Sequence, residues 1–461
     1  MSKIHAVVLA AGQGTRMKSK LYKVLHPVCG KPMVQHVVDT LDAMRVEDVV
    51  VVVGHGADAV RAALGDRVAY ALQQEQLGTA HAVQQAVPFL QGKQGTTFIL
   101  YGDVPLLSSE TLTALLQYHE QQQAAATVLT AKLPDPTGYG RMIRNEAGEV
   151  MRIVEHKDAS PEERAIREIN TGIYCFDNQK LLKSLSQVKN DNAQGEYYVT
   201  DCVGILREAG EKVVAYEAVD PEETMGVNDR VQLSEAEAYM RRRIAVRHMK
   251  NGVTIIDPAS TYIDADVTIG QDTVILPGTH LRGRTSIGAD CVIGPQANLT
   301  DVQVGDGVEI SYSVLTESQV ADKATIGPFA YVRPGSEIGT HVKIGDFVEL
   351  KNAKIGKGTK VPHLSYVGDA EIGEGVNIGC GTITVNYDGA VKHKTIVGDG
   401  SFIGCNTNLV APVTVGRNAY VAAGSTINQN VPDDALAIAR ERQVNKLGYA
   451  NKLPRKQVKK D

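Results

Sequence analysis

The chain has 461 residues, of which 43% are hydrophobic and 22% charged, and its 48 Lys and Arg against 53 Asp and Glu give a net charge of −5. The length predicts two or three globular domains, and the slightly acidic balance argues against general nucleic-acid binding. The six cysteines form no C-x-x-C pair, which favours reduced thiols over a disulfide framework or a structural zinc site. Because no apolar run reaches about 18 residues, we expect no signal peptide, no membrane span and a cytoplasmic protein.

Residues 1–229 alternate strand-like and helical patterns. Such alternation predicts a mostly parallel sheet covered on both faces, a Rossmann-like α/β domain whose ligands bind beyond the carboxyl ends of the strands. The predicted strands are residues 4–11, 49–53, 68–72 and 97–101, and the predicted helices are residues 32–44 and 108–121.

Two of these strand ends carry candidates for phosphate and metal chemistry. The first strand runs into the G-x-G-T-R segment 12–16, and Lys23 follows it. Glycines let the backbone approach phosphates, and Arg16 and Lys23 supply positive charge. The segment is neither a dinucleotide fingerprint nor a Walker A loop, so a simple tight turn is the alternative. Asp103 follows the fourth predicted strand. A carboxylate at a strand end beside a phosphate-binding loop is well placed to hold Mg²⁺, and the alternative is an aspartate that only stabilises a turn.

A helix separates this region from the rest of the chain. Residues 234–246 have acidic residues toward their start and basic residues toward their end, which matches the helix macrodipole. We interpret residues 230–250 as a linker helix, with packing against the first domain as the alternative, and assign it no chemistry.

From Ile263 to Ile427 an aliphatic residue recurs at intervals of six, with a few slips. Neither a helix nor an ordinary strand has this period. It is typical of a β-helix in which each unit is one short strand and a corner, and three units close a coil of about 18 residues, giving roughly nine coils. We therefore predict a β-helix over residues 251–437, with a β-sandwich as the alternative. Glycines after the aliphatic residues are expected to relieve crowding at the turns.

Two further segments depart from the repeat. Residues 384–395 insert polar and charged residues, and a loop on a rigid scaffold is a natural binding site, although a tolerated surface loop is the alternative. Residues 438–461 form a basic C-terminal tail, of which the segment 452–460 is predicted to be disordered, with no role beyond contact with coenzyme A phosphates.

Both halves resemble known families. Residues 9–25 resemble the L-x-A-G-x-G-T-R-[LM]…P-K signature of sugar-1-phosphate nucleotidyltransferases, with Tyr22 where that family usually has proline. The repeats resemble the left-handed parallel β-helix of hexapeptide-repeat acyltransferases, which are usually trimeric. Three further segments, 333–335, 363–366 and 386–389, extend the resemblance. With the nucleotidyltransferase signature and the repeats, they make residues 3–445, approximately, similar to one bacterial family, the bifunctional N-acetylglucosamine-1-phosphate uridylyltransferase/glucosamine-1-phosphate N-acetyltransferases. Other matching segments are 73–79, 101–103, 138–141, 154–157, 170–172 and 226–228.

That resemblance implies roles for residues of the first domain. Arg16 and Lys23 would be catalytic by neutralising the UTP triphosphate, and Asp103 and Asn228 would hold Mg²⁺. The remaining residues implied to bind the nucleotide or the N-acetylglucosamine moiety are Leu9, Ala10, Ala11, Gly12, Gln73, Gly78, Thr79, Tyr101, Gly140, Glu155 and Asn170.

In the β-helix the resemblance implies acetyl transfer, with His363 as general base on the amine of glucosamine-1-phosphate. The residues implied to bind the sugar phosphate are Arg333, Lys351, Tyr366, Asn377 and Lys392, and those implied to contact acetyl-CoA or its acetyl group are Cys380, Asn386, Tyr387, Cys405, Ala423 and Arg440. Cysteine stands where the family is expected to have alanine at 380 and serine at 405, and we expect acetyl transfer to be sensitive to thiol reagents.

The expected function is therefore two-step synthesis of UDP-N-acetylglucosamine, a precursor of peptidoglycan and lipopolysaccharide, with acetyl-CoA and UTP as co-substrates and a homotrimeric assembly. One alternative keeps the nucleotidyltransferase and makes the β-helix an oligomerisation scaffold, as in ADP-glucose pyrophosphorylases. His363 and the insertion argue against it. Another is a non-enzymatic exchange-factor subunit of translation initiation, and Arg16, Lys23 and Asp103 argue against that.

Overall fold

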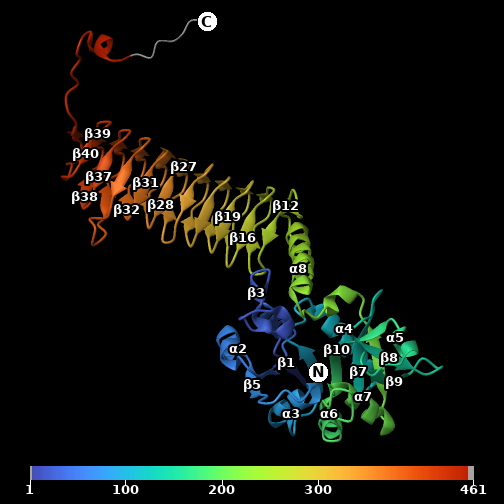
Figure 1. Cartoon of the computed structure of the whole chain (residues 1–461). Helices are drawn as coiled ribbons and strands as arrows, with labels where there is room; N and C mark the ends of the chain where they lie inside the picture. The colour runs from blue at the N-terminus through green and yellow to red at the C-terminus, as the bar shows by residue number, and fades with distance from the viewer. Residues whose placement is uncertain (1–2, 455–461) are drawn as a thin grey trace. The chain divides into compact units, whose positions relative to one another are not determined.

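A computed structural model describes residues 3–454, and the chain in it forms two compact units that divide after Ile244 (Figure 1). The division falls inside helix α8 (Arg230–Lys250). Helix α8 spans the residues predicted for the linker helix. Its first turn lacks acidic residues because it begins at Arg230, ahead of the segment 234–246, while Arg247, His248 and Lys250 occupy its last turn. Within residues 3–454, every helix is too short or too polar to cross a lipid bilayer.

The first unit is built on one mixed sheet in the order β11-β7-β10-β6-β1-β4-β5. The central strands β6, β1, β4 and β5 are parallel neighbours, and β10 runs antiparallel between β6 and β7. The predicted strands and helices of this unit are confirmed to within a residue at each end. The strands are β1 (Ile4–Ala10), β4 (Asp48–Val53), β5 (Ala69–Leu72), β6 (Thr96–Tyr101), β7 (Ala126–Lys132), β10 (Glu168–Asp177) and β11 (Val213–Glu217), with β8 (Gly140–Arg144) and β9 (Val150–Val154) pairing beside β10.

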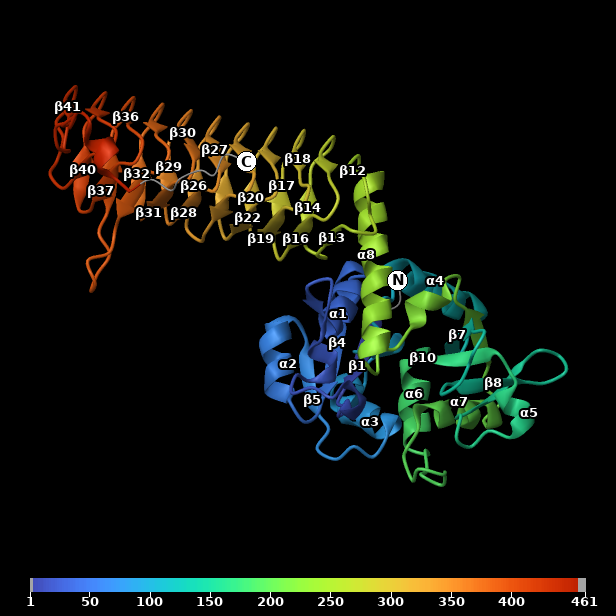
Figure 2. The same cartoon turned by 45° about the horizontal axis from the view of Figure 1, so that its top comes forward.

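Helices cover both faces of this sheet (Figure 2). Residues alternate along β1, so that Val7 and Leu9 enter one core while Ala6 and Val8 enter the other. The first core is closed by α3 (Thr79–Leu90), α6 (Asn178–Leu185) and α7 (Val199–Glu208), and the second by α1 (Met33–Ala43), α2 (Ala57–Leu64) and α4 (Ser109–Gln122). This three-layer arrangement leaves the carboxyl ends of the strands open to a ligand.

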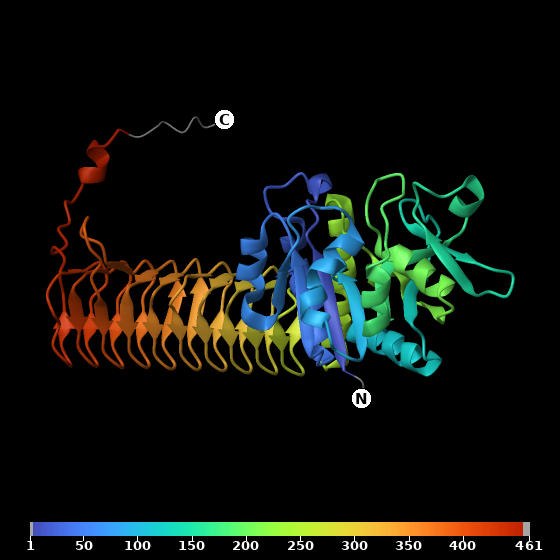
Figure 3. The ribbon, with the colours of Figure 1, turned by 90° about the horizontal axis from the view of Figure 1, so that it is seen from below.

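The second unit is the left-handed parallel β-helix that the repeat predicts (Figure 3). Its short strands run from β12 (Thr254–Ile255) to β41 (Leu436–Ala437) and form three parallel sheets of 11, 10 and 9 strands. The aliphatic residues of the repeat stack in register in its interior, as Ile326 does on Ile344 and Ile344 on Val361. Parallel stacking of this kind buries one aliphatic side chain per strand on every face of the coil.

Glycines that follow the aliphatic residues relieve crowding, as predicted. A Cβ added at Gly345 would lie 1.8 Å from the carbonyl oxygen of Pro362 in the next coil, and one at Gly288 would lie 2.2 Å from Asp306 Oδ1. Neither glycine has the left-handed backbone that a strained turn requires. The crowding comes from the next coil, so these glycines allow successive coils to approach closely.

Candidate functional site

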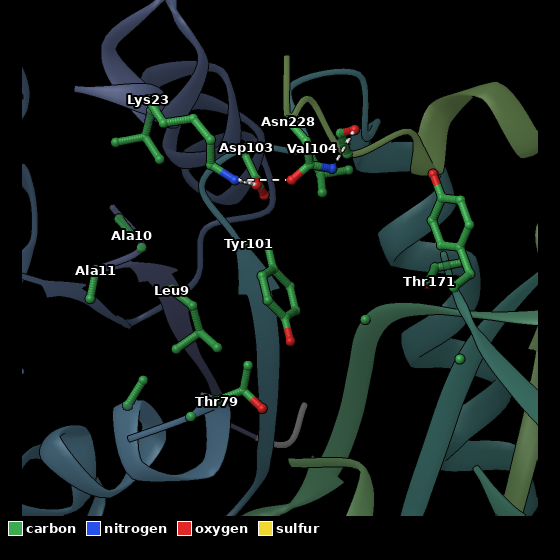
Figure 4. A pocket seen from close by; sticks show the side chains of 18 of the residues that line it. Leu9, Ala10, Ala11, Lys23, Thr79, Tyr101, Asp103, Val104, Thr171 and Asn228 are labelled. Carbon is green, nitrogen blue, oxygen red and sulfur yellow. Dashed lines mark hydrogen bonds and ion pairs between the residues drawn. The ribbon is translucent and has the colours of Figure 1, made fainter. Parts of the chain in front are cut away.

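A cavity of 480 Å³ opens at the carboxyl ends of β1 and β6 in the first unit (Figure 4). It is lined by every residue that sequence analysis assigned to this site: Leu9, Ala10, Ala11, Gly12, Arg16, Lys23, Gln73, Gly78, Thr79, Tyr101, Asp103, Gly140, Glu155, Asn170 and Asn228. These residues come from segments more than 200 positions apart, and the topology of the sheet brings them to one edge.

The glycine-rich segment after β1 folds back so that Lys23 faces this cavity. Gly14 has a φ of 64°, and a Cβ added there would lie 2.5 Å from Lys23 Cβ, so the close approach needs glycine. Tyr22 has a φ of −62°, a value that proline also adopts. The backbone therefore keeps the conformation that the family's proline would impose at this position.

Four polar side chains form a cluster beside the glycine-rich segment. Lys23 Nζ donates to Asp103 Oδ2 and to Asn228 Oδ1, the latter at 3.3 Å, and Arg16 Nη2 donates to Asn228 Oδ1 at 2.9 Å. Only 13% of the Lys23 side chain and 14% of the Asp103 side chain are exposed. Two hard oxygen ligands thus converge on one cationic group, which is the donor chemistry that suits Mg²⁺ when substrate phosphates supply further oxygens.

The opposite end of the cavity suits a neutral, hydroxyl-bearing group. Burial raises the pKa of the Glu155 carboxyl, and nearby acidic residues raise it further. Glu155 lies beside Gly140, where a Cβ would meet Glu155 Oε1 at 3.4 Å, and Asn170 Nδ2 donates to the Tyr174 hydroxyl at 2.8 Å. Other lining residues were given no role from sequence, although they lie in the matching segments 73–79, 138–141, 170–172 and 226–228; they are Gln76, Tyr139, Thr171 and Gly226.

A second cluster of predicted residues lies on the β-helix around β28 (Glu349–Lys351) and β31 (Tyr366–Gly368). Lys351 Nζ donates to Asp369 at 2.8 and 2.9 Å, and Arg333 Nη1 donates to Glu349 Oε1 at 2.9 Å. Burial acts to raise the pKa of Asp369, but hydrogen bonds from Asn352, Lys351 and Asn386 hold it below its usual value. Each of these two cations therefore forms an ion pair with a carboxylate of the protein, and an anionic ligand would share that cation with the carboxylate.

His363 stands at one border of this cluster and is oriented by a carboxylate that sequence analysis missed. His363 Nδ1 lies 2.5 Å from Asp346 Oδ1, and this hydrogen bond holds the pKa of Asp346 below its usual value. The two residues are register partners on successive strands, β27 (Lys343–Asp346) and β30 (Lys360–His363). With Nδ1 engaged, Nε2 is the nitrogen left to accept a proton.

The predicted insertion is a polar loop between β34 (Ile383–Val385) and β35 (Thr395–Val397), and it projects from the stack in Figure 1. Asn386 Nδ2 donates to Asp369 Oδ2 at 2.6 Å and lies 3.4 Å from the Tyr366 hydroxyl. Lys392 forms a hydrogen bond with Lys351, and this bond together with the positive charge of Lys351 lowers the pKa of Lys392. Tyr387 pairs with Lys392 across the loop, and its ring is exposed.

Three of the residues predicted to contact acetyl-CoA follow the same corner of the prism as His363. In the register of the strands, Asp346, His363, Cys380, Cys405 and Ala423 occupy equivalent corner positions on successive coils. Arg440 lies beside the last of them, since a Cβ at Gly424 would be 3.7 Å from Arg440 Cδ. Asn377 lies beside Lys360 on the adjoining sheet, and within residues 3–454 its side chain makes no hydrogen bond to the cluster.

Comparison with known proteins gives consistent matches for both units. The family described as nucleotidyl transferase matches residues 5–221, and that described as bacterial transferase hexapeptide (six repeats) matches residues 266–301, 317–352 and 394–429. Proteins described as "Bifunctional protein GlmU" are similar over nearly the whole chain: 80% identical in Brevibacillus brevis, 60% in Geobacillus sp. and 58% in Halalkalibacterium halodurans. Each comparison covers 98–99% of this chain and 99% of the relative.

Proposed function

The chain belongs to the family of bifunctional GlmU proteins, and from this membership we infer that it carries out two successive transfers. The β-helix transfers an acetyl group from acetyl-CoA to glucosamine-1-phosphate. The first unit then transfers a uridylyl group from UTP to the resulting N-acetylglucosamine-1-phosphate, forming UDP-N-acetylglucosamine and pyrophosphate. The observation that carries the acetyl half is the His363–Asp346 pair at the border of a cationic cluster.

Acetyl transfer needs a free amine, and the substrate amine is protonated at neutral pH. His363 Nε2 accepts that proton, the amine nitrogen bonds to the acetyl carbon, and the carbon–sulfur bond breaks to release coenzyme A as its thiol. Arg333, Lys351 and Lys392 bind the sugar phosphate. Tyr366 and Asn377 orient the sugar, Asn386 and Tyr387 position the acetyl group, and Cys380, Cys405, Ala423 and Arg440 line the path of the coenzyme.

Uridylyl transfer relies on positioning and charge. An oxygen of the sugar phosphate attacks the α-phosphorus of UTP in line, and the bond to the leaving pyrophosphate breaks without a covalent enzyme intermediate. Arg16 and Lys23 neutralise phosphate charge, while Glu155, Asn170 and Gly140 hold the acetylated sugar. Asp103 and Asn228 would hold Mg²⁺, which when bound supplies further stabilisation of phosphate charge.

We propose a cytoplasmic homotrimer as the working form. Its support is a ridge of exposed side chains, Tyr312, Phe329, Phe347 and Leu364, which follow one another on successive coils next to the His363 corner. Between 41% and 57% of each side chain is exposed, and the Phe329 and Phe347 rings stack with centroids 5.4 Å apart. A second copy of the β-helix is the occupant that this apolar ridge suits.

Product analysis tests the function directly. The full chain is incubated with acetyl-CoA and glucosamine-1-phosphate, then with UTP and Mg²⁺, and products are identified by mass spectrometry. We expect N-acetylglucosamine-1-phosphate in the first stage and UDP-N-acetylglucosamine with pyrophosphate in the second. If pyrophosphate forms only when N-acetylglucosamine-1-phosphate is supplied, the chain is a uridylyltransferase and its β-helix is a scaffold. If neither product forms, a non-enzymatic role is favoured.

Asp346 is expected to act as a positioning residue for the base. Asp346→Asn replaces the acceptor of the Nδ1–H with an amide that also presents a donor, so the imidazole loses its fixed tautomer and orientation. We expect kcat for acetyl transfer to fall by about 10- to 100-fold, less than for a fully buried triad aspartate because the pair is partly exposed. The KM for glucosamine-1-phosphate should stay within twofold, and Asp346→Glu should recover part of kcat. A rise in KM at unchanged kcat would contradict this role.

A further inference from the structure

Cys380 and Cys405 are neighbours on two successive coils of the β-helix. β33 (Asn377–Ile378) and β36 (Phe402–Ile403) pair in parallel register with Ile378 opposite Ile403, so the cysteines two positions further on face each other at one corner. The main chain ties the two coils together on both sides of the pair: Gly379 N donates to Ile403 O at 2.8 Å, and Asn406 N donates to Cys380 O at 2.7 Å. Hydrogen-bonded strands lie about 4.8 Å apart, which is inside the Cα separation of about 4.4–6.8 Å found across disulfides.

These two thiols differ from the others in their exposure. Cys405 is exposed and Cys380 is half-buried, whereas Cys29, Cys175, Cys202 and Cys291 are buried. Burial also raises the pKa of Cys175, Cys202 and Cys291, which keeps them protonated and unreactive. An oxidant dissolved in water therefore reaches Cys380 and Cys405 first.

The pair also lies in the middle of the column of corner residues defined above. His363 precedes it by one coil, and Ala423 follows it by one coil. Under the proposed function, this column is the path along which acetyl-CoA reaches the base. A covalent bond between the two cysteines would form on that path.

We propose that Cys380 and Cys405 are a redox-sensitive pair that closes to a disulfide and stops acetyl transfer. A hydroperoxide oxidises one thiol to a sulfenic acid and is itself reduced to an alcohol or water. The second thiol, as its thiolate, attacks the sulfenic sulfur, the sulfur–sulfur bond forms, and water leaves with the released proton. A dithiol reverses the change by thiol–disulfide exchange.

The consequence for acetyl transfer follows from geometry. A disulfide holds its two Cβ atoms about 3.5–4.5 Å apart and fixes the rotamers of both side chains, so the two sulfur atoms take one orientation at the corner while the strands keep their spacing. The bridged sulfur atoms change the shape of the surface that lines the path, and a displacement near 1 Å at a reacting group can cost about 10²-fold in rate. Uridylyl transfer uses residues of the other unit and is expected to continue.

The test uses the full chain, first reduced and freed of reductant, then treated with hydrogen peroxide that catalase afterwards removes. Remaining thiols are alkylated, and a non-reducing digest is searched for a peptide linked through Cys380 and Cys405. N-acetylglucosamine-1-phosphate formation is measured by mass spectrometry, because peroxide consumes the free thiol that a coenzyme A assay detects. We expect the linked peptide, a loss of acetyl transfer of about 10²-fold, recovery with dithiothreitol, and uridylyl transfer within twofold of its starting rate.

Matched variants assign the effect to the pair. In Cys405→Ser and Cys380→Ala, each compared with its own reduced form, peroxide should no longer lower acetyl transfer. In Cys291→Ala, which removes a buried thiol of the same β-helix, the loss should remain. Absence of the linked peptide, a linked peptide with unchanged acetyl transfer, or a loss that persists in both corner variants would overturn the proposal. The proposal rests on the proposed acetyltransferase activity, whose failure would show separately as no acetylated product from the reduced protein.

Discussion

Replacing His363 by asparagine is expected to lower kcat for acetyl transfer by about 10²- to 10⁴-fold, with uridylyl transfer unchanged. Asparagine retains a side-chain donor for Asp346 Oδ1, 2.5 Å from the imidazole in the native protein, but offers no group that accepts a proton at neutral pH. The amine of the substrate then stays protonated, and the thioester has no nucleophile. The two activities are measured on the same preparation, so uridylyl transfer reports that the protein is intact.

His341→Asn is the matched control for this substitution. His341 is an exposed residue of the same β-helix, and its φ of 60° is a conformation that asparagine tolerates. Both variants therefore replace an exposed imidazole of the β-helix by the same asparagine side chain. Acetyl transfer by His341→Asn should match the wild type. Retention of more than about a tenth of the wild-type rate by His363→Asn would remove His363 from the role of general base.

The fold could be predicted because its two halves carry different and persistent periods. A six-residue spacing of aliphatic residues over more than 160 positions suits a three-sided coil, and each such residue, Ile326, Ile344 and Val361 among them, lies in the interior. The α/β unit follows from apolar runs that match β1 and β6, whose ends lie side by side. Local pattern was sufficient for these elements because each of them obeys it.

The contacts within the sites depend on information that the pattern does not hold. Asp346 and His363 are 17 positions apart because the coil between them is one residue short, and this slip decides which side chains share a corner. Cys380 and Cys405 are further apart in sequence because the insertion 384–395 lies between them. Register across such irregular coils is set by three-dimensional packing, so neither pair could be assigned from spacing alone.

Lys23→Ala is expected to lower kcat for uridylyl transfer by about 10²- to 10³-fold, the usual cost of removing one preorganised charge from a site of developing negative charge. Lys23 is largely buried, and its ammonium donates to both Asp103 and Asn228. In the complex with UTP it is placed to neutralise phosphate oxygens, and alanine leaves that charge to Arg16 alone. Acetyl transfer should be unaffected, since the residues proposed for it belong to the other unit.

Lys31→Ala separates this effect from the loss of a buried ion pair. Lys31 is matched to Lys23 in burial, with 13% of each side chain exposed, and it too pairs with a carboxylate, that of Asp39 at 2.6 Å. It does not line the cavity. Both variants should lose thermal stability, Lys31→Ala less, because Asp39 keeps Arg67 Nη2 at 2.5 Å whereas Lys23→Ala removes the ammonium beside the largely buried Asp103. Only Lys23→Ala should release pyrophosphate more slowly than the wild type. Equal rates of pyrophosphate release in the two variants would show that the charge of Lys23 stabilises the fold and does not contribute to uridylyl transfer.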